Sequence, residues 1–184
     1  MLAYSSVAHA GFVITALVST TVAGISAVLT YLFLYAIATL GVFAVISLVR
    51  HQDGREATDL ADWAGLGRRN PWLGGAFTLL LLSMAGIPLT AGFVAKFGVF
   101  QAAAQAHFGV LVIVGVISSA VAAVFYLRVV AVLFFTETPP QTPVVVRPMV
   151  TSALVGSAAV ATLLLGIFPQ PLLHLAEHAG NLLH

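Results

Sequence analysis

The chain has 184 residues, of which 60% are hydrophobic and only 7% are charged. About a quarter of the residues of a soluble globular domain are charged, so this composition indicates an all-α integral membrane protein. The absence of cysteine excludes disulfides and iron–sulfur clusters held by the chain, and a net charge of +1 argues against a nucleic-acid-binding surface.

Charge-free runs predict five membrane crossings, because a crossing helix needs about 20 apolar residues. The first 49 residues carry no Lys, Arg, Asp or Glu and fit two crossings joined by a tight turn at 19–24. Residues 1–184 are expected to form a single membrane domain with a polar loop at 50–70 and a short C-terminal helix at the membrane interface. The expected crossings are about 2–18, 25–49, 71–104, 108–135 and 149–168.

The third predicted crossing is too long for one straight helix and contains the sequence Gly86-Ile87-Pro88. Proline lacks a backbone N–H and disfavours helical backbone at the residue before it, so we expect a discontinuous helix here. Backbone groups freed inside a bilayer need protein or water partners. The hydroxyl of Thr90 is a candidate to hold water beside this break.

The basic residues predict the orientation of the chain in the membrane. Six of the seven lie on one side under the five-crossing interpretation, and the turns on the other side carry none. By the positive-inside rule, the 50–70 loop and the N-terminus are cytoplasmic and the C-terminus is outside. The six are Arg50, Arg55, Arg68, Arg69, Arg128 and Arg147.

Lys96 is the one basic residue that does not fit this sorting. It lies about 12 Å from Pro88 and about 14 Å from Gln105 along a helix, so its side chain does not easily reach either surface. A lysine at the centre of a membrane helix costs roughly 2.5–3.5 kcal/mol even on an insertion scale, and such residues usually have a function. Broken helices with a nearby ionisable group recur in ion and proton transporters, so we predict proton transfer at Lys96.

His9 is the second candidate for proton transfer. Ser5 and Ser6 precede it by four and three residues and share its helix face, and an imidazole can both donate and accept a proton. A neutral histidine held by hydrogen bonds is an equally good interpretation of this motif. Tyr31 and Tyr35, spaced four residues apart, suggest a polar seam in the next helix.

The helix predicted at 108–135 contains polar residues with simpler interpretations. Ser119 and Ala123 are typical of a helix-packing surface of small residues. Arg128, with Tyr126 beside it, is expected to anchor the helix end at the membrane interface.

His174 and His178 lie four residues apart in the C-terminal tail, with Glu177 nearby. This spacing suits part of a metal site, but the sequence offers no third ligand, so we expect no metal centre.

Four segments together resemble subunit N of respiratory complex I, an antiporter-like, proton-translocating membrane subunit of NADH–quinone oxidoreductase. The resemblance covers essentially the whole chain, and the segments occur in the same order. They are "LAYSSVAHAGF" (2–12), "LLSMAGIPLTAGFVAKFGVF" (81–100), "YLRVVAVLFF" (126–135) and "LLLGIFPQPLL" (163–173).

The resemblance implies that Lys96 lies on a discontinuous helix and transfers protons, and that His9 belongs to the same polar axis. It implies a subunit of a translocating enzyme complex that performs no redox catalysis itself. NADH, flavin, iron–sulfur clusters and quinone would be bound by other subunits, so no cofactor is expected in this chain. The implied partners are the other membrane subunits, especially antiporter-like neighbours, and the lipid bilayer.

Two departures from the family pattern affect this interpretation. Leu89 stands where many relatives have a second proline, and the chain matches only the last part of a full subunit. We therefore expect a truncated or split product that does not pump protons alone. The alternatives are a component of a cation/proton antiporter or a membrane-bound hydrogenase, and a passive membrane scaffold.

Overall fold

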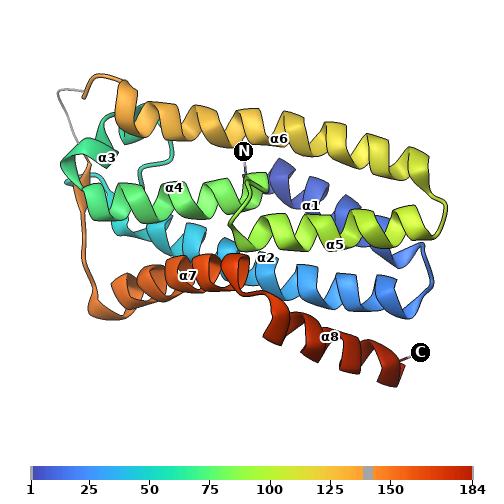
Figure 1. Cartoon of the computed structure of the whole chain (residues 1–184). Helices are drawn as coiled ribbons and strands as arrows, with labels where there is room; N and C mark the ends of the chain where they lie inside the picture. Colours follow the sequence, from blue (N-terminus) through green and yellow to red (C-terminus); the bar gives the residue numbers. More distant parts are fainter. Residues whose placement is uncertain (1, 139–142, 184) are drawn as a thin grey trace.

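The structure, a computed structural model that describes residues 2–138 and 143–183, is a bundle whose long helices run side by side (Figure 1). Its described elements include a 3₁₀ helix, η1 (Leu60–Trp63), and two short strands, β1 (Val49–Arg50) and β2 (Val144–Val145). The α-helices are α1 (Leu2–Leu17), α2 (Val22–Leu48), α3 (Leu66–Arg69), α4 (Pro71–Ala85), α5 (Ala91–Gln105), α6 (Gly109–Phe135), α7 (Met149–Ile167) and α8 (Gln170–Leu183).

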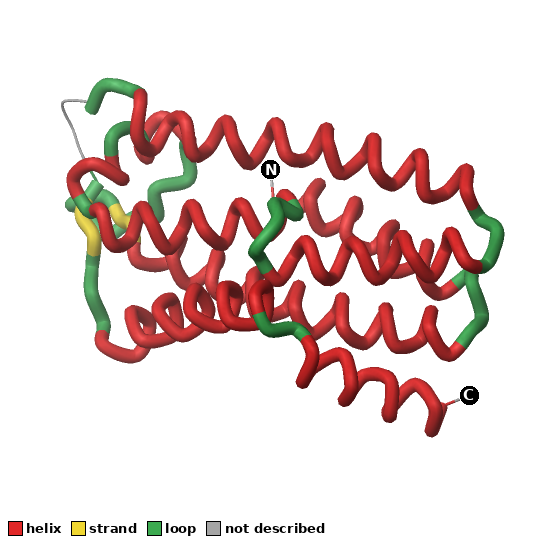
Figure 2. The backbone as a smooth tube through the Cα atoms, viewed as in Figure 1, coloured by secondary structure: helices red, strands yellow, loops and turns green. Residues whose placement is uncertain are grey.

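The helices confirm the expected all-α, strongly apolar fold, and helix dominates the described backbone in Figure 2. Three of them, α2, α6 and α7, are long and apolar enough to cross a membrane, while α1 and α4 are apolar but shorter. Each of α2 and α6 has 27 residues, which corresponds to about 40 Å and exceeds the roughly 30 Å of a bilayer's hydrocarbon core.

The predicted helix ends agree with the structure to within a few residues, with one clear difference at the first turn. Helix α2 begins at Val22, three residues before the predicted start, because Thr21 caps it. The Thr21 hydroxyl accepts a hydrogen bond of 3.1 Å from the Gly24 N–H, which satisfies one of the free donors of the first turn. The predicted turn at 19–24 is therefore too long.

The region predicted to hold a helix break contains two separate helices, α4 and α5, joined by residues 86–90 (Figure 1). Helix α4 ends at Ala85 and is capped by Gly86, whose φ of +84° places it in the left-handed region that glycine adopts without strain. Leu89 also has a positive φ, +71°, which proline cannot adopt. This turn therefore differs in backbone conformation from one that carries proline at that position.

The core consists of two buried apolar clusters that meet at mid-length of the bundle. One packs the C-terminal half of α2 against α4, α6 and α7, and the other packs the N-terminal half of α2 against α1 and α5. Lys96 contacts Met84 and Ala85 of the first cluster and Phe12 of the second. The predicted site thus lies at the boundary between the clusters.

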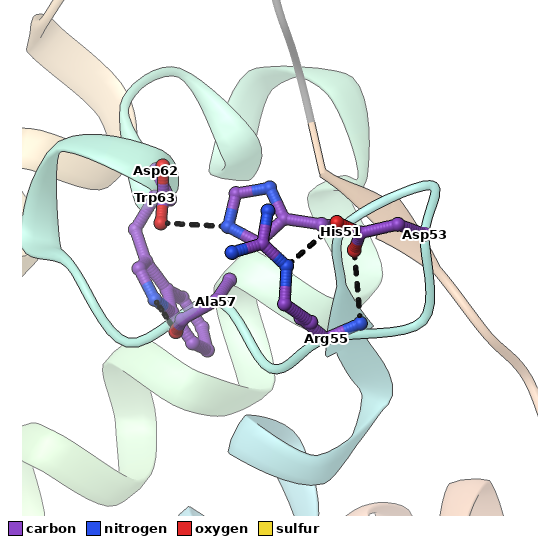
Figure 3. Close-up of polar contacts among 6 residues, drawn as sticks. All are labelled: His51, Asp53, Arg55, Ala57, Asp62 and Trp63. Carbon is purple, nitrogen blue, oxygen red and sulfur yellow. Dashed lines mark hydrogen bonds and ion pairs between the residues drawn. The ribbon is translucent and has the colours of Figure 1, made fainter.

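The segment predicted as a polar loop at 50–70 is more ordered and more buried than expected. Trp63 is 6% exposed and donates a hydrogen bond of 3.1 Å to the Ala57 carbonyl oxygen (Figure 3). His51 contacts Asp62 at 3.1 Å, and β1 pairs with β2 in an antiparallel ladder. These contacts fold the segment against the end of the bundle.

Asp53 lies at the exposed tip of this loop, where it contacts Arg55 (Figure 3). The Arg55 backbone N–H and its guanidinium both donate hydrogen bonds to the carboxylate, at 3.0 and 2.6 Å. These donors favour the ionised form and hold the pKa of Asp53 below its ordinary value.

Candidate functional site

Lys96 is buried near the middle of the bundle and is 5% exposed. Its Nζ donates hydrogen bonds to the carbonyl oxygens of Met84 at 3.0 Å and Ala85 at 2.9 Å, and to the hydroxyl of Ser119 at 2.8 Å. An ammonium group has three N–H donors, so these acceptors use its full donor set. The lysine does not point into lipid.

The helix break supplies the two carbonyl oxygens. Because α4 stops at Ala85, the carbonyls of its last turn have no partner further along the same helix. These groups also form the negative end of the helix dipole, which favours a cation. Lys96, projecting from α5, therefore caps the C-terminus of α4.

No carboxylate of the surrounding helices α1, α2, α4, α5, α6 and α7 neutralises Lys96. Neutral groups surround the ammonium, including the Phe12 ring, whose centroid is 5.2 Å from Nζ. All six acidic residues of the sequence lie outside those helices, at Asp53, Glu56, Asp59, Asp62, Glu137 and Glu177.

His9 is also buried, at 5% exposed, and both ring nitrogens face hydroxyl groups. Nδ1 lies 2.6 Å from the Tyr31 hydroxyl, and Nε2 lies 3.3 Å from the Tyr126 hydroxyl. The Tyr35 ring stacks on the imidazole with a centroid separation of 4.3 Å, and the Tyr126 hydroxyl also hydrogen-bonds to Ser5. Helices α1, α2 and α6 thus fix the position of the imidazole.

A small cavity separates the histidine from the lysine. The volume that the centre of a water molecule could occupy in this cavity is about 10 Å³. Its lining includes His9, Tyr31, Tyr35, Ser83 and Lys96. This is about the space needed by one water molecule, and hydroxyl, imidazole and ammonium groups around it supply polar partners. The cavity is suited to a single water between the two basic side chains.

The structure brings most of the predicted site residues together, but not all of them. Lys96, His9, Ser5, Tyr31 and Tyr35 lie at the boundary between the clusters, and Gly86 forms the turn that exposes the carbonyls to the lysine.

The other predicted residues, Ser6, Thr90 and Pro88, make no hydrogen bond to Lys96 or His9 in the described part of the chain. Ser6 is exposed, donates to the Leu2 carbonyl oxygen and accepts from the Tyr35 hydroxyl at 3.3 Å, so it does not hold the histidine. Thr90 donates to the Ile87 carbonyl oxygen at 2.7 Å, and Pro88 is exposed in the turn. Both contribute to the break and neither contacts Lys96 through the hydrogen bonds of the described residues.

Sequence reasoning missed the contribution of α6. Ser119, interpreted as a packing residue, binds Lys96, and Tyr126, interpreted as a neighbour of an interfacial anchor, is 2% exposed and contacts His9. These residues are seven apart, about two helical turns, and share a face with Ala122 and Ala123. The seven-residue spacing of Ser119 and Tyr126 on one helix face is the feature of the sequence that could have identified this contribution.

The tail histidines lie away from this site. His174 contacts Glu177 at 3.8 Å, and both side chains are largely exposed on α8. In residues 2–138 and 143–183, no cluster of three or more potential metal ligands is found.

Comparison with known proteins gives a consistent family. Residues 1–122 match the family model described as NADH:quinone oxidoreductase/Mrp antiporter, TM. The chain is 56% identical over 181 residues to NADH-quinone oxidoreductase subunit N of Rhodococcus opacus, which covers 98% of this chain and 33% of that protein. It is 54% identical over 187 residues to the subunit of the same name from Mycobacterium tuberculosis H37Rv, covering 100% of this chain and 35% of that protein.

Solved structures agree with this assignment. A chain of respiratory complex I from Thermus thermophilus with bound aureothin has a TM-score of 0.78 and 36% identity, covering 94% of this chain and 38% of that chain. A chain of the Mrp complex from Dietzia sp. has a TM-score of 0.85 at 23% identity, covering 97% of this chain and 41% of that chain, which shows a shared fold. This chain spans about a third of the length of the curated relatives named above. It belongs to the NADH:quinone oxidoreductase/Mrp antiporter transmembrane family.

Proposed function

We propose that this chain is the proton-translocating part of a membrane subunit in a proton-pumping NADH–quinone oxidoreductase. The observation that carries the proposal is the position of Lys96. Its ammonium is buried, held by the free carbonyls of a helix end and a hydroxyl, and has no carboxylate partner in the surrounding helices. A buried ionisable group at such a break is expensive to maintain and is typical of proton and ion transport sites.

In the proposed mechanism, Lys96 and His9 exchange a proton through one water molecule in the cavity between them. The ammonium releases a proton to the water and becomes a neutral amine, and the water passes a proton to the imidazole. The lone charge is sensitive to changes in hydration and to nearby charges because no carboxylate compensates it. Moving one charge against 100 mV requires about 2.3 kcal/mol, which redox chemistry in other subunits would supply.

The proposed topology has five crossings within one membrane domain, residues 1–184. Helices α4 and α5 form one discontinuous crossing, interrupted at Gly86–Pro88, and the 16 residues of α1 supply about 24 Å of the first crossing. The end with the loop at 50–70, which carries four arginines, faces the cytoplasm with the N-terminus. The C-terminus lies outside a bacterial inner membrane, and α8 packs along α2 toward that surface and does not lie flat at the interface as the sequence predicted.

The proposed partners are other membrane subunits of the complex, including antiporter-like neighbours. This chain has no cysteine to ligate an iron–sulfur cluster, and its charged residues are few. NADH, flavin, iron–sulfur clusters and quinone therefore belong to other subunits in this proposal.

A component of a cation/proton antiporter is the second candidate, favoured by the fold shared with a chain of the Mrp complex. Sodium-dependent proton movement in the absence of NADH would distinguish it from a redox-driven pump.

The test compares Lys96→Met with Arg128→Met in the complete protein, in vesicles of bacterial membrane. Methionine keeps most of the side-chain volume and removes the charge, and Arg128 is an exposed basic residue on α6. Lys96→Met is expected to lower proton uptake per NADH oxidised while the control remains at the wild-type level. Wild-type uptake and quinone reductase activity in Lys96→Met would refute the role of Lys96 and would favour a passive scaffold.

A further inference from the structure

The last two helices of the chain are interrupted near mid-length of the bundle. Helix α7 ends at Ile167, and α8 begins at Gln170 and continues toward the opposite end of the bundle (Figure 1). Ala158 of α7 packs beside Gly41 in the second half of α2, whereas Gly180 of α8 packs against the first turns of that helix. The two helices together therefore run along the whole of α2 as a second discontinuous element.

Two prolines explain why α7 stops at this point. Pro169 and Pro171 have no N–H, so they cannot donate to the carbonyl oxygens of Leu165 and Ile167, four residues before them. Carbonyl groups freed inside a bilayer need partners from protein or water. They also form the negative end of the α7 dipole. The end of α7 is thus a polar feature in an otherwise apolar helix.

This end of α7 packs directly on the turn between α4 and α5. A Cβ atom built on Gly166 would lie 2.4 Å from the Leu89 carbonyl oxygen and 2.7 Å from the Thr90 Cα atom. Both separations are below 3.0 Å and both partners are backbone atoms, so no flexible side chain could give way there. Thr90 is the N-cap of α5, so the negative end of α7 meets the positive end of α5.

The turn that α7 contacts is joined to the lysine site by short hydrogen bonds. The Gly92 N–H, in the first turn of α5, donates to the Ser83 hydroxyl of α4 at 2.9 Å. The next two residues of α4, Met84 and Ala85, supply the carbonyl oxygens that hold Lys96, at 3.0 and 2.9 Å. The separation of the α4 and α5 ends therefore decides whether the ammonium reaches both carbonyls.

We propose that Gly166 is a positioning residue for the Lys96 site. The end of α7 holds the 86–90 turn at the separation of α4 and α5 at which the ammonium reaches its carbonyl partners. A methyl group at position 166 would displace the turn at Leu89 and Thr90, and the displacement would pass into α5, which carries Lys96. This assignment rests on the proposed function of Lys96 and adds to it a residue from another crossing.

The first test compares Gly166→Ala with Gly156→Ala in the complete protein, in vesicles of bacterial membrane. Gly156 is the matched control because it lies on the same helix, and the atom nearest to a built Cβ, Trp72 Cζ2, is at an ordinary contact distance of 3.7 Å. Gly166→Ala is expected to lower proton uptake per NADH oxidised severalfold, while Gly156→Ala stays at the wild-type level. Wild-type uptake in Gly166→Ala, assembled at the wild-type level, would overturn the inference.

A double variant separates positioning of Lys96 from a general packing defect. If Gly166 acts through the lysine, uptake in Gly166→Ala/Lys96→Met equals that in Lys96→Met alone, because the group to be positioned is already absent. Losses that multiply in the double variant would overturn the positioning role. If Lys96→Met is silent, the proposed function itself fails. Reduced uptake in Lys96→Met with wild-type uptake in Gly166→Ala would overturn this inference alone.

Pro169→Ala is the second variant, for the case in which Gly166→Ala does not assemble. Alanine supplies the N–H that the Leu165 carbonyl lacks, so α7 is expected to lengthen and its end to withdraw from the turn. Hydrogen exchange of the amides of residues 86–93 should then become severalfold faster than in Pro148→Ala, which changes the exposed proline before α7, and proton uptake should fall. Unchanged exchange at the turn or wild-type uptake would overturn the inference.

Discussion

Replacement of Gly86 by alanine should damage the site through two separable effects. At φ +84°, an L-residue in the left-handed region costs roughly 1–2 kcal/mol. A Cβ atom at this position would also lie 2.8 Å from Cδ and 3.2 Å from Nζ of Lys96, so the lysine must move away from the α4 carbonyls. Loss of one charge-assisted hydrogen bond adds about 1.5–3 kcal/mol. The expected total is therefore roughly 2.5–5 kcal/mol.

Two other glycines separate these effects. Gly54 has a φ of +85° and no atom within 4 Å of a built Cβ, so Gly54→Ala carries the backbone cost alone, roughly 1–2 kcal/mol. Gly75 lies within α4, with open space around a built Cβ, so Gly75→Ala should stabilise the helix by up to about 1 kcal/mol. Stability is measured as the free energy of unfolding of the complete protein in mixed detergent micelles. The effect on the lysine site is measured as proton uptake in vesicles. The reasoning is refuted if Gly86→Ala unfolds no more easily than Gly54→Ala and pumps like the wild type.

Three further predictions concern single contacts. Tyr126→Phe removes the hydroxyl next to His9 Nε2. It should lower the free energy of unfolding by about 1 kcal/mol and reduce proton uptake in vesicles. An unchanged free energy of unfolding together with unchanged proton uptake would contradict the role of that contact. Leu89→Asn should raise the free energy of unfolding by roughly 1 kcal/mol, because asparagine tolerates the positive φ of this position. Leu89→Pro should lower it, because proline cannot adopt that φ. If Leu89→Pro were the more stable variant, the turn would have another conformation. In an NMR titration, the pKa of the Asp53 carboxylate should lie below its ordinary value of 3.8. The contact with Arg55 is then present above that lowered pKa and is lost as the pH falls through it. A titration midpoint at or above 3.8 would contradict the geometry of the loop.

The sequence predicted the parts of the site that depend on local chain properties. A single charge in a long apolar run identified Lys96, and Gly86 with Pro88 identified the helix end that provides its carbonyl partners. Both signals are contained within one predicted crossing, where helix geometry relates sequence separation to distance.

Contacts between helices were harder to predict. Ser119 is 23 residues from Lys96, and Tyr126 is 117 residues from His9, so neither pairing follows from helical periodicity. The relative rotation of α6 depends on packing against α1, α4 and α5 together, which a hydropathy pattern does not determine. Trp63 is buried in a segment that composition predicts to be a polar loop, and its burial also depends on packing between elements far apart in the sequence.

The lysine cap at the end of α4 links two properties that are usually independent. A neutral amine has two N–H donors. In the proposed mechanism, loss of a proton from Lys96 would therefore leave one of three acceptors, the Met84 or Ala85 carbonyl or the Ser119 hydroxyl, without its donor. The protonation state of one side chain is thereby converted into a change in the anchoring of a helix terminus. Loss of one proton from the side chain would therefore loosen the C-terminal end of α4.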